Sequence, residues 1–285
     1  MAYIPIVVGT NILVIWGIVL YPGFHTVNNY LIVNLCVSDL LIGGFAMPMF
    51  VLAYTHRTQR YIFGNRFACL LWFASIEFAG GGSLWSLFSI AVDRYLAVMR
   101  PLSYNSIVTT QTVLTSIFSM WGSMALFSLL PMMGWNQYSY KEVELALRCN
   151  FFKTLPPAYV FLVLMSKLAC IITCAVIYSQ IIWISYKQVQ LFREQYASMS
   201  TPQIAQFESR VSSIKITSCL MFLFILLWLP NIILAPIKYY EMFNQETVEV
   251  LHVASRVLQF GNSLVNAPVF AIGRHEYRQV YTLML

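Results

Sequence analysis

The stretch SIAVDRYLAVMRPL, residues 89–102, places an acid and a base, Asp93 and Arg94, between two apolar runs. The run before them, SLWSLFSIAV, and the LAVM that follows are both suited to lipid. A guanidinium cannot lose its charge, so Arg94 must either pair with an acid or reach water. Near the end of an apolar helix both choices are open, and the pair therefore predicts an element with two states.

The composition indicates that most of the surface faces something apolar. Of 285 residues, 59% are hydrophobic and only 10% are charged, and the mean hydropathy is +0.69. A soluble domain of this length would carry about a quarter charged residues. The chain is therefore predicted to be a membrane protein.

Seven stretches are long and apolar enough to cross the hydrocarbon as helices, which takes about 20 residues each. Strand-like alternation, which a barrel would need, is missing. We predict an all-α bundle of seven transmembrane helices in one domain, 1–285, with a short amphipathic helix on the membrane surface at 274–284. The predicted spans are 2–20, 28–54, 67–98, 110–131, 157–186, 211–239 and 247–271.

Several function classes find no support in the sequence. The net charge of +6 is spread over the loops without a basic patch, so nucleic acid is not an expected partner. No HExxH, GxSxG or paired-acid arrangement is present, which argues against an enzyme. Lys and Arg are almost evenly divided between the loops of the two sides, so they do not orient the chain.

Polar residues inside the spans are costly and are therefore candidates for function. Asp39 is the clearest, and Ser83, Asn262 and Asn266 are expected to approach it from two other helices. Asn262 and Asn266 are four residues apart and share one helix face. Oxygens from three helices around one carboxylate would suit a small cation, with sodium the candidate. A hydrogen-bonded network that only joins helices is an equally good interpretation.

These residues also belong to a set of motifs that resembles the rhodopsin-like (class A) G-protein-coupled receptors over essentially the whole chain. The resemblance rests on Asn11, Asp39 in LxxxD, Cys69, DRY at 93–95, Trp121, Tyr178, WLP at 228–230 and NSLVN at 262–266. It implies a multi-pass plasma-membrane receptor with its N-terminus outside the cell, a small-molecule ligand on that side and a heterotrimeric G protein inside.

The resemblance also implies a switch at the cytoplasmic face. Asp93 holds Arg94 at rest, and Leu102 would insert into the G protein. The acid that usually closes this face from the sixth helix falls on Arg210, which predicts signalling without ligand. The residues implied in switching and coupling are Asp93, Arg94, Tyr95, Leu102, Tyr178 and Arg210.

Cys69 and Cys149 are expected on one side of the membrane, where a disulfide can join them if that side is oxidising. The run Gly80-Gly81-Gly82 weakens its helix by about 1 kcal/mol per glycine relative to alanine, unless a neighbouring helix packs closely against it. The seventh-helix motif is altered to NAPVF, with Phe270 in place of a tyrosine.

Within the class, the chain looks most like the adenosine receptors. AVDRYLAVMRPLSYNSIVT, LPMMGWN at 130–136 and CNFF at 149–152 are similar to that subfamily, and Phe151 matches the aromatic that stacks on the purine. Other ligand contacts of the subfamily are absent. The sixth-helix asparagine falls on Ala235, and the seventh-helix Ser-His pair falls on Gln259 and Phe260.

Charged residues replace those contacts. Glu77 and Arg256 are expected to face the ligand cavity, with Lys167 in the fifth span. They would bind the polar ends of a zwitterionic or anionic ligand, or Glu77 and Lys167 would simply pair with each other. The predicted ligand-binding residues are Glu77, Phe151, Trp228, Asn231, Arg256, Gln259 and Phe260. A channel or proton-coupled carrier that uses Asp39 and Glu77 is the alternative function.

Overall fold

Seven long helices and four short helical segments make up the described part of the chain, and no strand occurs in it. The structure is a computed structural model that describes residues 3–142, 144, 148–195, 201–239 and 244–273. The predicted surface helix at 274–284 lies outside these residues. The predicted fold class, a bundle of membrane-spanning helices, is confirmed.

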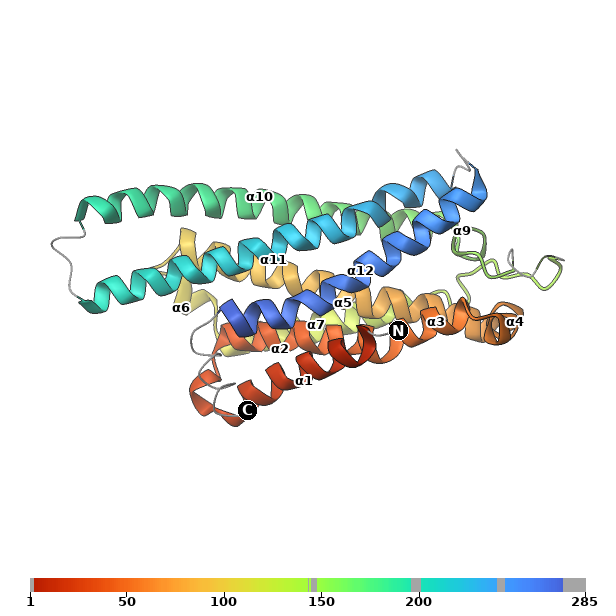
Figure 1. The fold of residues 1–285 in the computed structure, drawn as a ribbon, viewed down its shortest axis with the longest axis horizontal. Coiled ribbons are helices and arrows are strands. Elements are labelled where there is room, and N and C mark those ends of the chain that lie inside the picture. The colour runs from red at the N-terminus through yellow and green to blue at the C-terminus, as the bar shows by residue number, and fades with distance from the viewer. Residues whose placement is uncertain (1–2, 143, 145–147, 196–200, 240–243, 274–285) are drawn as a thin grey trace.

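The long helices run roughly parallel or antiparallel to one another (Figure 1). The second is interrupted by a π-helical turn, so it counts as three segments. In chain order they are α1 (Tyr3–Leu20), α2 (Val27–Leu41) with η2 (Ile42–Ala46) and α3 (Met47–Ala53), α5 (Arg66–Met99), α7 (Thr110–Leu129), α10 (Pro157–Gln195), α11 (Thr201–Tyr239) and α12 (Gln245–Gly273).

Short helices mark the two ends of the bundle. α4 (His56–Gly64) and α9 (Phe151–Thr154) lie at one end, which we call the α4 end. α6 (Tyr104–Ile107) lies at the opposite end, the α6 end, and η1 (Pro22–Phe24) connects α1 and α2. At the α6 end α10 and α11 project past the other helices (Figure 1). Each is also longer at this end than the span predicted from the sequence, by about 14 Å at a rise of 1.5 Å per residue.

Six of the described helical stretches are long and apolar enough to cross a membrane, and α12 is not among them. Polar residues of α12 that are buried inside the bundle explain its lower hydropathy: Ser255, Arg256, Gln259, Asn262, Ser263 and Asn266. The seventh helix is present, but its inward face is polar.

The third long helix, α5, is the centre of the bundle. In its most apolar window 78% of the residues are buried, against 6% for α7, which lies at the periphery. α5 contacts α2, α7, α10 and α11. A residue change on α5 therefore affects more neighbours than a change on any peripheral helix.

Two of three consecutive glycines let α7 approach α5. A Cβ on Gly82 would lie 2.8 Å from the ring of Trp121, and one on Gly81 would lie 2.8 Å from the sulfur of Met124. A Cβ on Gly80 would meet only the ring of Trp228, at 3.7 Å, which is an ordinary contact. The close packing that would offset the helix-weakening effect of this run is thus present for two of the three glycines.

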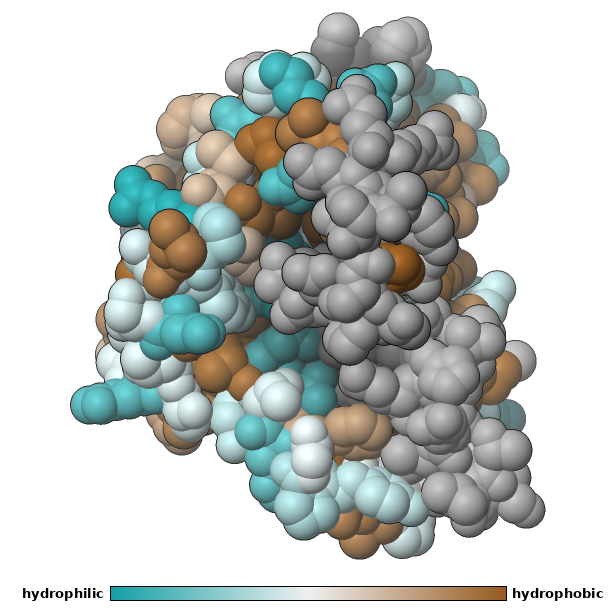
Figure 2. Space-filling view, turned by 90° about the vertical axis from the view of Figure 1, so that its left-hand side faces the viewer, coloured by the Kyte–Doolittle hydropathy of each residue, from teal (hydrophilic) through white to brown (hydrophobic). Residues whose placement is uncertain are grey.

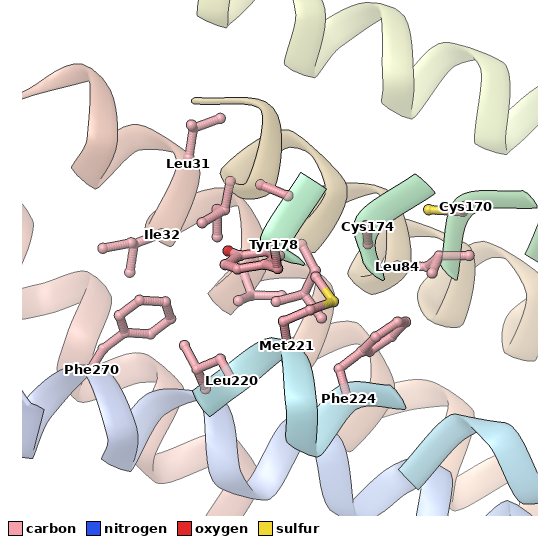
Figure 3. Packing of buried hydrophobic residues seen from close by; sticks show 14 of the residues in the cluster. Leu31, Ile32, Leu84, Cys170, Cys174, Tyr178, Leu220, Met221, Phe224 and Phe270 are labelled. Atoms are coloured by element: carbon pink, nitrogen blue, oxygen red, sulfur yellow. The ribbon is translucent and has the colours of Figure 1, made fainter. Parts of the chain in front are cut away.

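The core near the α6 end surrounds Tyr178 of α10. Figure 3 shows this side chain in the middle of the cluster, with Ile32 of α2 on one side and Met221 of α11 on another. Phe270 of α12 is fully buried in the same cluster. The surface of the α6 end, seen face-on in Figure 2, mixes hydrophilic and hydrophobic residues where it is not grey.

Candidate functional site

A cavity of about 280 Å³ opens inside the α4 end of the bundle. α3, α4, α5, α9, α11 and α12 all contribute to its wall, so it lies between helices that are far apart in the sequence. Its lining residues are Phe50, Tyr54, Gln59, Phe63, Trp72, Phe73, Ile76, Glu77, Cys149, Asn150, Phe151, Lys238, Glu249, His252 and Arg256.

Aromatic rings form most of the apolar wall. Trp72 stacks on Phe63 with ring centres 5.8 Å apart, and on Phe73 at 5.0 Å. Phe73 meets Phe151 edge-on at 5.4 Å. Aromatic rings held in this way keep a rigid shape and accept a flat or apolar ligand body.

A disulfide between Cys69 and Cys149 holds the loop that supplies Phe151. Cys69 lies in the first turns of α5 and Cys149 directly precedes α9. The predicted bridge is confirmed, and it fixes one side of the cavity to the central helix.

Glu77 of α5 and Lys167 of α10 form a buried ion pair beside the cavity. The Lys167 Nζ lies 2.9 Å from one carboxylate oxygen of Glu77 and 2.8 Å from the other. Glu77 lines the cavity, but Lys167 is not among its lining residues. The sequence allowed Glu77 and Lys167 either to bind a ligand or to pair with each other, and the structure contains the pair.

A second ion pair, which the sequence analysis did not predict, lies among the lining residues. Lys238 of α11 pairs with Glu249 of α12, and the hydroxyl of Tyr54 donates to Glu249 at 3.1 Å. Three helical segments are thereby joined around one carboxylate. The spacing of Glu249, His252 and Arg256 places all three on one face of a helix, which was the available signal in the sequence.

Arg256 is buried and makes no ion pair within the described residues. Its Nη1 donates to the amide oxygen of Gln259 at 2.9 Å, one turn along α12. Within the described part of the chain, two further polar atoms of the lining have no hydrogen-bond partner, Nε1 of Trp72 and Nδ1 of His252.

Four of the predicted ligand-binding residues lie deeper in the bundle. Trp228, Gln259 and Phe260 border a space of only about 10 Å³, and Asn231 donates to the hydroxyl of Ser255 at 3.2 Å. The cavity thus brings together Glu77, Phe151 and Arg256, and leaves the other four outside.

Of the proposed sodium ligands, Ser83 and Asn266 contact Asp39, and no hydrogen bond within the described residues joins Asn262 to it. One carboxylate oxygen accepts from Asn266 at 2.8 Å, and the other accepts from Ser83 at 3.3 Å. Nδ2 of Asn262 has no partner among the described residues. The set fits a hydrogen-bonded network, and its carboxylate, hydroxyl and amide oxygens are also the donor type that a small hard cation takes.

At the α6 end Asp93 is the centre of a second polar cluster. Nε of Arg94 donates to Asp93 at 2.8 Å, and the hydroxyl of Tyr104 in α6 donates to the other carboxylate oxygen at 2.6 Å. Burial, together with the Asp93 carboxylate, raises the pKa of Tyr104 well above its ordinary value, so this hydroxyl remains a donor. No motif in the sequence singles out Tyr104 for this contact.

The other predicted switch residues are spread over the α6 end. Tyr95 follows Arg94 on α5, and Tyr178 is buried in the core cluster. Leu102 is fully exposed. Arg210 lies in α11, and its side chain falls outside the described part of the structure.

Comparison with known proteins gives a family and distant relatives. Residues 10–270 match the model of the 7 transmembrane receptor (rhodopsin family). The chain is 29% identical to the adenosine receptor A3 of Bos taurus over 277 residues, 96% of this chain and 84% of the relative. It is 25% identical to the adenosine receptor A2b of Gallus gallus over 292 residues, 95% of this chain and 82% of the relative.

Proposed function

The chain belongs to the rhodopsin family of seven-transmembrane receptors, and from that premise we propose that its cavity at the α4 end binds an extracellular small molecule with a negative or zwitterionic group. The family implies coupling to a G protein and places the chain among multi-pass membrane receptors rather than enzymes. We further propose that it acts in the plasma membrane with the α4 end outside the cell.

One observation supports the proposal above all: a single helix joins the cavity to the polar cluster around Asp93 at the α6 end. Glu77 lines the cavity and Arg94 lies at the α6 end of the same uninterrupted helix, α5. At 1.5 Å per residue they are about 25 Å apart along its axis. A ligand that shifts or rotates α5 changes the position of Arg94 directly.

A negative or zwitterionic ligand is preferred over a nucleoside because of the residues that line the cavity. Phe151, which resembles the purine-stacking aromatic, is in the wall, but Ala235, Gln259 and Phe260 stand where the adenosine receptors would supply their polar contacts. The similarity to relatives named adenosine receptors therefore supports common descent with them, and it does not support adenosine as the ligand of this chain.

The test is ligand-stimulated nucleotide exchange. The full chain is reconstituted in lipid nanodiscs with purified heterotrimeric G proteins of each α class, and nucleosides, amino acids and organic acids are screened. We expect at least one acid or amino acid to accelerate exchange of GDP for GTP, and no acceleration without the receptor.

The same preparation distinguishes a receptor from a channel or carrier. Ion flux through liposomes that contain the chain and no G protein, combined with no exchange under any ligand, would contradict the proposal. Asp39 and Glu77 are engaged separately, by Asn266 and by Lys167, and no hydrogen bond in the described residues joins one acid to the other. The hydrogen bonds of the described residues therefore do not connect the two acids that a relay would use.

A further inference from the structure

The charges around the cavity do not cancel. Of its two lining acids, Glu77 pairs with Lys167 and Glu249 pairs with Lys238, so each carboxylate already has its own cation. Arg256 is the remaining cation, buried, with an amide oxygen as its hydrogen-bond acceptor. Arg256, Glu77 and Lys167 interact electrostatically and together carry one net positive charge. A buried net charge is costly, so the cavity favours a ligand that brings one negative charge.

Two of the lining side chains, Arg256 and Trp72, are hydrogen-bond donors only. The guanidinium of Arg256 has five N–H groups and the indole of Trp72 one, and neither side chain can accept. Nε1 of Trp72 has no acceptor among the described residues. A carboxylate, which accepts hydrogen bonds through two oxygens and donates none, matches such a lining.

The apolar part of the cavity limits the body of the ligand. Phe63, Phe73 and Phe151 supply flat faces and edges beside Trp72, and the volume of about 280 Å³ is at or below the small end of known ligand pockets. One ring with a short chain suits this wall better than a large or strongly polar body.

We propose that the cavity is specific for a small monoanion, an aryl or arylalkyl carboxylate, with its carboxylate on Arg256 and its ring against Trp72, Phe73 and Phe151. This proposal rests on the cavity being the ligand site. Glu77 forms its ion pair with Lys167, and no ion pair joins it to Arg256 in the described residues. A zwitterion is disfavoured because its ammonium group would find no unpaired carboxylate in the lining.

Four probes that share one ring and differ in charge test the proposal. They are 3-phenylpropionate, 3-phenylpropionamide, phenethylamine and phenylalanine, each added to the purified full chain in nanodiscs. At about 10 mM even a ligand with a Kd of about 1 mM occupies most of its sites, and binding to the folded state raises Tm. We expect only 3-phenylpropionate to raise Tm.

Two substitutions link this shift to Arg256. Arg256→Gln should weaken binding of 3-phenylpropionate at least about tenfold, because hydrogen bonds between charged groups are the strongest. Arg256→Lys should keep part of the shift. Arg57→Gln is the matched control, since Arg57 is an exposed arginine on α4 that does not line the cavity.

The outcomes separate this inference from the proposed function. Three results would each overturn the proposal that the cavity is specific for a monoanion. They are a rise in Tm with the amine, the amide or phenylalanine equal to that with the acid, no rise with the acid, and a rise with the acid that survives in Arg256→Gln. Nucleotide exchange stimulated by another ligand would in those cases leave the receptor function intact. Binding of 3-phenylpropionate without any nucleotide exchange would instead contradict the proposed function alone.

Discussion

Asp39 is buried and accepts hydrogen bonds from two helices, α5 and α12, which makes it sensitive to any cation that enters its surroundings. If Asp39, Ser83, Asn262 and Asn266 hold sodium, the ion stabilises the resting arrangement of these helices. Raising the sodium concentration should then lower agonist affinity, because a ligand shifts a two-state equilibrium only by its differential affinity.

The substitution Asp39→Asn removes the charge and keeps the shape of the side chain. We expect agonist affinity in this variant to be the same in sodium and in a large organic cation, measured by competition binding at constant ionic strength. A parent receptor that does not respond to sodium would leave the hydrogen-bonded network as the sole role of these residues.

Leu102 is an apolar side chain that is completely exposed, one residue after Pro101. Nothing within the described residues covers it, and it contributes no burial to folding. We expect Leu102→Asp to reduce G-protein nucleotide exchange by at least tenfold while ligand binding is unchanged, because a charge would have to be desolvated in the complex. Exchange at the parent rate would show that the residue has no part in coupling.

At the scale of the helix, Gly80 and Gly82 allow a matched comparison. Replacing either by alanine should strengthen α5 by about 1 kcal/mol through helix propensity alone. At Gly82 that gain is opposed by a contact of 2.8 Å with Trp121, whereas at Gly80 the nearest atom is 3.7 Å away. We expect Gly82→Ala to lower Tm and Gly80→Ala to raise it, measured in the same detergent.

Trp121 is held in place from a third helix, which is why it cannot simply move away from a larger residue at position 82. Its indole Nε1 donates to the side-chain oxygen of Asn34 at 2.8 Å, and Asn34 in turn donates to Ser86. A Gly82→Ala variant as stable as the parent would mean that this network yields without cost.

The ion pair between Glu77 and Lys167 connects α5 to α10 inside the bundle. Its contribution to the free energy of unfolding therefore depends on both residues being present. Glu77→Gln or Lys167→Met alone leaves a buried charge without a partner and should destabilise the protein by roughly 3–5 kcal/mol. The double variant should recover most of that loss, because neither member of the pair is then left as a buried charge without its partner. Thermal unfolding of the four proteins gives the coupling energy directly, and additive losses would show that the pair is not coupled.

For the whole molecule the balance between resting and active arrangements is the quantity that matters. Arg210 replaces the acid that closes the cytoplasmic face in related receptors, so the sequence predicts two arginines, Arg94 and Arg210, at that face. A repulsion of about 1–2 kcal/mol shifts a two-state equilibrium by roughly 5- to 30-fold. We expect measurable nucleotide exchange without ligand, reduced in Arg210→Glu.

One contact at the α6 end opposes the repulsion between the two arginines, because it holds Arg94 in its resting position. Tyr104 donates to Asp93, which also binds Arg94, and the three residues connect α5 to α6. Basal exchange should therefore rise further in Tyr104→Phe, which serves as the positive control. Basal exchange equal to that of cells without the receptor, at matched surface expression, would contradict the argument from Arg210.

The sequence by itself determined the membrane, the helices and the positions of the buried acids. Apolar runs of about 20 residues have no stable form in lipid other than helices, since every backbone group must be satisfied internally. The placement of Asp39 and Asp93 within those runs indicated where polar clusters would form. Both follow from local composition and spacing, which need no knowledge of the neighbouring helices.

Only the tertiary structure decided which charges cancel. Glu77 and Lys167 are ninety residues apart, and Tyr54 and Glu249 lie even further from each other in the chain, so no periodicity could pair them. The direction in which each helix turns its polar face sets these partners, and that depends on packing throughout the bundle. Within the described residues the same packing gives Arg256 the amide oxygen of Gln259 as its acceptor in place of an acid, and the proposed ligand chemistry rests on that contact.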